Sequence, residues 1–296
     1  MKLALVLAVA LPILAADVRT ELREHMLALV NRDRARHNLP AVQLDASAAW
    51  HADRFAEEQL ETGAAGHFNL RGEGPHVRWS AVHFRSDHVN ENASSWSTNR
   101  ELTDTTIKDM MRRSQESMMA EEPPADGHRR AILDPWATHL APGVAWKGGE
   151  LRFSQIFLRR YVTLEPLPKA LWMKDRVTIR GWIIGDETFD SVTVHSEPLP
   201  RPLTAKEASA ISSYALPKRY TRYLPRLDRW RTYLDGTHGD VVIDKKKFTV
   251  EIGFNDGPGI YTIVVWIKPA GSGPIEVTNH AIRVEESPAA ETLQVR

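Results

Sequence analysis

Three residues that lie far apart in the chain have side chains that could act together: His67, Glu91 and His128. Two imidazoles and a carboxylate can ligate a divalent metal ion, or the carboxylate can orient an imidazole by accepting its N–H group. Most histidines in proteins are instead surface or packing residues with satisfied hydrogen bonds. The spacing alone therefore raises a hypothesis that depends on how the surrounding elements fold.

Two of these residues follow glycines. Gly127 precedes His128, and we expect it to turn the chain and place His128 in a loop, anchored by the apolar residues Ile132 and Leu133. Gly66 precedes His67 after a predicted helix, so a loop is expected there as well. The region 67–88 contains four histidines in a short span, which suggests a polar site at the surface: His67, His76, His83 and His88.

The elements around these residues can be predicted from apolar spacing and caps. Apolar residues recur at helical intervals in residues 17–37, 46–62 and 103–119, with Asp45 placed to cap the second helix. Residues 68–97 read as irregular, and 151–162 as a strand. Met110, Met111 and Met118 fall on one face of the third helix, where core packing is the favoured role.

The composition changes at residues 164–168, and the region beyond is mainly β. Alternating β-branched and aromatic residues predict strands at 177–184, 191–195, 248–254, 260–267 and 275–284, typical of a β-sandwich that could be immunoglobulin-like. Thr204 and Glu207 form a capping box for a short helix. Tyrosines and tryptophans between arginines in residues 214–234 could hold glycans or polyanions, although inward packing of the aromatic rings is the favoured interpretation.

Composition excludes several classes of function. Lysine plus arginine equal aspartate plus glutamate at 38 each, so net charge gives no reason to expect a nucleic acid partner. Cysteine is absent, which excludes thiol catalysis, cysteine zinc sites and disulfides. Lys2, an apolar run and Ala15-Ala16 resemble a cleaved export signal, and no membrane span is expected in the mature chain. We therefore expect a secreted or periplasmic protein.

Several short motifs occur in an order that resembles the CAP domain, the fold of cysteine-rich secretory proteins, venom antigens and pathogenesis-related proteins, in its cysteine-free bacterial form. The similar residues, all within 17–162, are Asn31 with Arg34, Leu39-Pro40, Gly66-His67, Asn90-Glu91-Asn92, Gly127 to Leu133 and Phe153 to Phe157. Three positions depart from the motifs: Asn90 replaces a glycine, Ala131 an asparagine and Ala145 a glycine.

The resemblance implies an α-β-α sandwich with a cleft of two histidines and two acidic residues, which in some members binds zinc. His67 and His128 are then the metal candidates, and Glu91 is one carboxylate. Glu116 is our choice for the second, with Glu121 and Glu122 as competitors. Asn92-Ala93-Ser94 is also a glycosylation sequon, but its place in the cleft motif favours a structural role for Asn92.

These observations predict an α+β protein with a three-layer α-β-α sandwich followed by an all-β sandwich. The expected segments are a signal at 1–16, a CAP-like domain at 17–163, a linker at 164–175, a β-sandwich at 176–286 with an insertion at about 197–240, and a flexible tail at 287–296. We expect a binding protein whose cleft holds a divalent metal ion such as zinc or a small ligand, and whose β domain contacts a surface, glycan or protein. Two alternatives stay open: a metal-dependent extracellular hydrolase with Glu91 or Glu116 as base, and an adhesive protein with a vestigial cleft.

Overall fold

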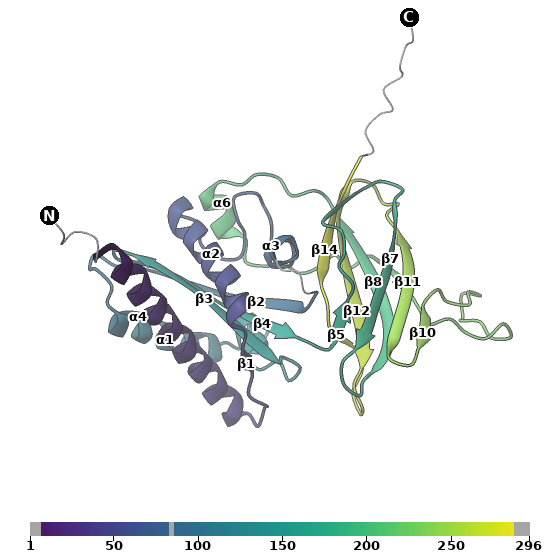
Figure 1. The fold of residues 1–296 in the computed structure, drawn as a ribbon, viewed down its shortest axis with the longest axis horizontal. Helices are drawn as coiled ribbons and strands as arrows, with labels where there is room; N and C mark the ends of the chain where they lie inside the picture. Colours follow the sequence, from purple (N-terminus) through teal and green to yellow (C-terminus); the bar gives the residue numbers. More distant parts are fainter. Residues whose placement is uncertain (1–6, 83–85, 287–296) are drawn as a thin grey trace, which may run out of the picture. The chain divides into compact units, whose positions relative to one another are not determined.

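The structure is a computed structural model that describes residues 7–82 and 86–286 (Figure 1). Residues 1–6 of the expected signal and all of the expected tail at 287–296 lie outside the described residues, as does His83. The chain divides into two compact units, and each unit includes a segment that is distant in sequence from the rest of it. Unit 1 comprises residues 1–75, 89–159 and 202–214; unit 2 comprises 76–88, 160–201 and 215–296. The domains expected from the sequence are continuous stretches of the chain, and their boundaries stay a prediction.

Unit 1 is built on one mixed sheet in the order β1-β3-β4-β2. The strands are β1 (Gln43–Leu44), β2 (His88–Ser97), β3 (His139–Lys147) and β4 (Glu150–Arg159). β1 is parallel to β3, and β3 forms an antiparallel hairpin with β4 in which Val144 pairs with Phe153. β2 is therefore an edge strand next to β4.

Helices cover both faces of this sheet. On one face α1 (Leu7–Arg36), α4 (Asp104–Met119) and α5 (Gly127–Ile132) contribute side chains to the main core, together with alternate residues of β3 and β4. Ile107, Met111 and Met118 are buried there, which confirms the packing role expected for the methionines. On the other face α2 (Ala46–Thr62) packs against β3 and β4 (Figure 1). The α-β-α order predicted from the sequence is the architecture of this unit.

Helix boundaries in unit 1 follow the caps. The Asp45 carboxylate accepts the Ala48 N–H at 2.9 Å, and α2 ends at Gly63 in the left-handed conformation with φ of 71°. Thr103 caps α4 with a reciprocal pair of hydrogen bonds to Thr106. The expectation that residues 68–97 are irregular is wrong, because α3 (Pro75–Val82) and the strand β2 both lie in this region.

Unit 2 is a β-sandwich. One sheet has the order β10-β11-β7-β5, and the other β6-β14-β12-β8-β9 with β13 also paired to β12. Phe189 of β8 and Phe248 of β11 link the two sheets, with ring centroids 4.9 Å apart. An immunoglobulin-like topology stays a prediction. The strands are β5 (Val162–Leu164), β6 (Ala170–Trp172), β7 (Arg176–Ile183), β8 (Thr188–Glu197), β9 (Tyr220–Tyr223), β10 (Val242–Asp244), β11 (Lys247–Gly253), β12 (Gly259–Lys268), β13 (Ile275–Glu276) and β14 (His280–Glu285).

The basic aromatic segment divides between two kinds of environment. The Tyr233 hydroxyl donates to Pro225 O at 2.8 Å, and Tyr223 is partly buried, as inward packing requires. Trp230 and Tyr220 are instead exposed, at 80% and 51%, so the favoured inward interpretation is wrong for these two rings. The Arg229 guanidinium lies 4.2 Å from the centroid of the Trp230 ring. Among the described residues, no helix combines the length and the apolar character needed to cross a membrane.

Candidate functional site

His67 lies in the loop after α2, and the loop is fixed from both sides. Gly66 has φ of 85°, and its carbonyl accepts a hydrogen bond from the Gln59 side-chain amide at 2.7 Å. This turn presents His67 toward β2, where its Nδ1 atom lies 3.0 Å from Glu91 Oε1. Both side chains are buried, so the hydrogen bond is shielded from water.

Strand β2 directs neighbouring residues to opposite faces of the sheet, because side chains alternate along a strand. Glu91 reaches His67, whereas the Asn92 amide donates to Gln155 Oε1 and to His128 O, both at 3.1 Å. Asn92 is 1% exposed, which fits the structural role expected for it. This one strand therefore holds the loop of His67 on one side and the helix of His128 on the other.

His128 is the second residue of the short helix α5, so the expectation that it lies in a loop is wrong. Gly127 begins this helix and is not among the glycines with positive φ, so no sharp turn depends on it. Glu121 orients the histidine: one of its carboxylate oxygens contacts His128 Nδ1, and the other accepts the backbone N–H groups of His128 at 3.0 Å and Arg129 at 3.3 Å. The same carboxylate thus satisfies helix-terminal donors and fixes the imidazole.

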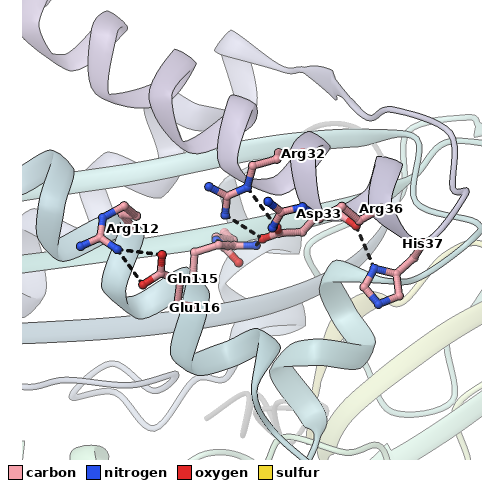
Figure 2. A network of polar contacts seen from close by, with 8 residues as sticks. Arg32, Asp33, Arg36, His37, Arg112, Gln115 and Glu116 are labelled. Carbon is pink, nitrogen blue, oxygen red and sulfur yellow. Dashed lines mark hydrogen bonds and ion pairs between the residues drawn. The ribbon is translucent and has the colours of Figure 1, made fainter.

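Glu116, our choice for the second cleft carboxylate, lies elsewhere. Its side chain is 52% exposed and is bound by Arg112 Nη1, with both carboxylate oxygens at 2.7 Å (Figure 2). Its neighbour Gln115 faces the core instead and donates to Asp33 at 2.9 Å. Adjacent residues of a helix point in different directions, so Glu116 is turned away from the core face. Glu122 is exposed, and Glu121 is the carboxylate beside His128.

The two imidazoles face each other. Their ring centroids are 6.4 Å apart with an angle of 30° between the ring planes. The His67 side chain is 9% exposed, whereas that of His128 is 36% exposed. Each ring has its own carboxylate at Nδ1, an arrangement that selects the tautomer with Nε2 as the acceptor when the ring is neutral. The site therefore offers two oriented imidazoles with unequal access.

A zinc ion shared by the two imidazoles would need their ligating nitrogen atoms to converge. Two imidazoles on one tetrahedral zinc have ligating nitrogens roughly 3.4 Å apart, given bonds of about 2.1 Å. Here the ring centroids lie 6.4 Å apart with 30° between the ring planes, and each carboxylate is engaged with an imidazole. Within residues 7–82 and 86–286, no group of three or more His, Cys, Asp or Glu side chains could hold a metal ion. As they stand, the described side chains form two histidine–carboxylate pairs.

One site residue has no counterpart in the sequence-based predictions. Tyr214 follows the helix α6 (Ala205–Ala210) and belongs to unit 1. Its ring lies 4.8 Å from the His67 ring at 62°, and its hydroxyl accepts the Glu91 N–H at 2.8 Å. The hydroxyl hydrogen is directed to Asn90 Oδ1 at 2.7 Å or Glu91 O at 2.8 Å. A tyrosine more than one hundred residues away in the chain gives no local signal that connects it to His67.

The other histidines that the structure describes in the region 67–88, His76 and His88, are not part of this site. His76 and His88 belong to unit 2, where His88 Nε2 lies 3.1 Å from Glu276 Oε2 and His76 Nε2 lies 3.4 Å from Glu197 Oε1. All three described histidines of the cluster are buried. The expectation of one surface site rich in histidine is therefore wrong.

Comparison with known proteins gives a family for part of the chain. Residues 27–157 match the family described as CAP: Cysteine-rich secretory protein family, and this match covers less than half of the chain. No curated protein matches the chain.

Two solved structures have a limited likeness to the chain. One is an extracellular protein containing a SCP domain from Bacillus anthracis str. Ames, with 18% identity, a TM-score of 0.37, and coverage of 48% of this chain and 41% of that chain. The other is a chitin binding domain from Burkholderia pseudomallei, with 11% identity, a TM-score of 0.25, and coverage of 40% and 57%. The chain thus spans about two fifths and somewhat over half of these two proteins. At these TM-scores neither likeness supports an inference about fold or ligand.

Proposed function

We propose that this CAP domain, residues 27–157, is a binding module that takes a small polar ligand or a divalent metal ion at His67 and His128. The observation that supports the proposal is the pair of facing imidazoles, each bound through Nδ1 to its own carboxylate. Groups held in this way are preorganised, so a ligand does not have to order them when it binds. Such preorganisation is typical of a recognition site.

The orientation of the rings favours a particular ligand chemistry. When a carboxylate accepts the Nδ1 hydrogen, Nε2 of a neutral imidazole carries a lone pair and accepts hydrogen bonds. A ligand that donates, through hydroxyl or amine groups, is therefore preferred over an anion. A metal ion would bind through the same Nε2 atoms, and His128 is the more accessible of the two ligands because its side chain is 36% exposed.

Histidine-detected NMR tests this proposal directly. Long-range proton–nitrogen spectra of the full chain report the tautomer of each ring, and titration with zinc chloride or with a panel of polyols and amines reports contact at Nε2. We expect both rings to be protonated at Nδ1, and the His128 signals to shift with at least one class of probe. Gln substitution of His128 should abolish the response, whereas Gln substitution of the exposed His37 should leave it unchanged.

The zinc titration decides between the two ligand classes. A zinc-induced rise in melting temperature that is lost in both the His67→Gln and His128→Gln variants would support metal binding. A response to polyols or amines without one to zinc would support the small-ligand class. If neither ring responds to any probe, the binding proposal is contradicted.

The unit 2 segment around Trp230 supports a second binding role, toward a glycan or another surface outside the cell. An 80% exposed indole stacked with the Arg229 guanidinium offers a flat contact beside positive charge. Trp230→Ala should reduce retention on polysaccharide beads, and Trp172→Ala, which removes another exposed tryptophan, is the matched control. Equal retention of both variants would contradict this role. We also propose that the protein is exported, which fractionation of the producing cells would test.

A further inference from the structure

Residues 202–214 form hydrogen bonds with the loop that carries His67. This segment is joined at both ends to unit 2 in the chain, but its contacts place it in unit 1. Its helix α6 begins with the capping box of Thr204 and Glu207, in which Thr204 N donates to Glu207 Oε2 at 2.8 Å. It is therefore an ordered part of unit 1, although the residues that precede and follow it in the chain belong to unit 2.

Residues 202–214 form these contacts on both sides of His67. On one side, Leu203 N donates to Leu70 O, and Ala65 N donates to Ser209 Oγ, both at 2.9 Å. On the other side, the Tyr214 hydroxyl is fixed by Asn90 and by the backbone of Glu91. The histidine thus lies between two sets of hydrogen bonds made by one segment.

The Tyr214 ring accounts for the unequal access of the two histidines. It lies 4.8 Å from the His67 ring, whose side chain is 9% exposed, whereas the His128 side chain is 36% exposed. His67 is thus covered by an aromatic ring from outside the residues 27–157, and His128 remains accessible. A ligand that needs both imidazoles meets His128 first and Tyr214 next.

We propose that residues 202–214 are a built-in cover of the ligand site and that Tyr214 must leave before a ligand contacts His67. Because the hydroxyl is held by a few hydrogen bonds of ordinary strength, opening is a local event rather than unfolding of the domain. Such a cover would control access to the ligand site described above, and its role therefore rests on the proposed function. Accessibility of His67 can nevertheless be measured without any ligand.

Chemical modification of histidines in the full chain measures that accessibility. Diethyl pyrocarbonate acylates the neutral imidazole, and mass spectrometry of peptides gives a rate constant for each histidine. Rates measured over a range of pH are extrapolated to the fully neutral ring, which separates access from protonation. His128 and the exposed His37 serve as internal references within each variant.

We expect Tyr214→Ala, which removes the ring together with its hydrogen bonds, to raise the His67 rate by about tenfold or more. Tyr214→Phe and Asn90→Ala, which keep the ring but loosen it, should raise the rate by a smaller factor. The His128 rate should stay within about twofold of the original. If Tyr214→Ala does not fold, Tyr214→Phe and Asn90→Ala decide the question.

A His67 rate that stays at its original value in every folded variant would overturn the cover. A parallel zinc and polyol titration separates this outcome from failure of the proposed function. If modification of His67 accelerates but no probe binds, the cover stands and the ligand assignment fails. If probes bind equally well with and without Tyr214 and the rate is unchanged, the cover fails alone.

Discussion

At the scale of single residues, Arg34 links three separate segments of unit 1. Its fully buried guanidinium donates to Pro40 O at 2.9 Å and to Ile132 O and Asp134 O at 2.8 Å. The carbonyls come from the loop that follows α1, from the last residue of α5 and from the turn that follows α5. A planar group with several donors can satisfy such a set at once, which a lysine cannot.

We therefore expect Arg34→Lys to lower the free energy of unfolding by about 2–4 kcal/mol, since carbonyls are left without donors. Arg36→Lys, on the same helix with a side chain that is 66% exposed, should change it by less than about 0.5 kcal/mol. Urea unfolding followed by circular dichroism compares the two. Equal destabilisation by both variants would show that the Arg34 hydrogen bonds have no special role.

The sequence was sufficient to predict several residues of the site, but not all of the side chains that contact them. His67 and Glu91 were expected to meet, and they lie 3.0 Å apart, because a turn and a strand each present one residue to the same place. Glu116 was chosen because it precedes His128 in the region where the resemblance implies an acidic residue, with Glu121 and Glu122 as competitors. Its position beside the core-facing Gln115 already turns it outward. Tyr214 could not be found, since its contact with His67 depends on how a distant segment folds back.

At the scale of elements, two glycines of unit 1 differ in the space around them. A Cβ atom at Gly143 would lie 2.6 Å from the Ala52 Cβ, because α2 crosses β3 in direct contact there. A Cβ atom at Gly127 meets nothing within 4 Å, and this glycine is part of a helix. The first position requires glycine for packing, and the second does not.

Gly143→Ala should therefore destabilise the chain by about 1–3 kcal/mol through overpacking. Gly127→Ala should be neutral or stabilise it by up to about 1 kcal/mol, because alanine favours the helix. Differential scanning calorimetry of both variants is the appropriate comparison. Destabilisation by Gly127→Ala would contradict this expectation and would favour the sharp turn at Gly127 that was predicted from the sequence.

Elements were predictable where a cap or an apolar stripe defined them. Asp45 caps α2 as expected, and the apolar face of α4, which Thr103 caps, is buried. β2 was missed because it carries Asn90, Glu91, Asn92 and serines in place of alternating apolar residues. It is the edge strand of its sheet and bears the polar groups of the site, so its sequence reflects those contacts rather than burial on one face.

At the scale of the whole molecule, stability should depend on a histidine remote from the site. Burial lowers the pKa of His280 in unit 2 from 6.5 to about 4. The unfolded chain takes up a proton at this residue near pH 6.5, whereas the folded chain does so only near pH 4. The contribution of the neutral His280 to the free energy of unfolding is therefore fully present above pH 6.5 and is lost as the pH falls from 6.5 toward 4.

This shift corresponds to a loss of about 3 kcal/mol of stability at pH 4 relative to neutral pH. His280→Asn, which retains a polar group near Ser86, should remove that part of the pH dependence. Unfolding free energies at pH 7, 5.5 and 4, compared between the two proteins, isolate it from other titrating groups. An identical decline in both would show that His280 does not titrate across this range.

The exchange of segments between the units affects how the chain can be divided. Residues 76–88 lie in the first half of the sequence but belong to unit 2, and residues 202–214 lie in the second half but belong to unit 1. After a single cut by a protease introduced at 165–169, each fragment would still supply part of both units. We expect the nicked protein to migrate as two bands in denaturing gels and as one species in size exclusion. One break in the backbone would then leave both units complete, whereas a shortened chain that ends at residue 163 would lack residues 202–214, the proposed cover of His67.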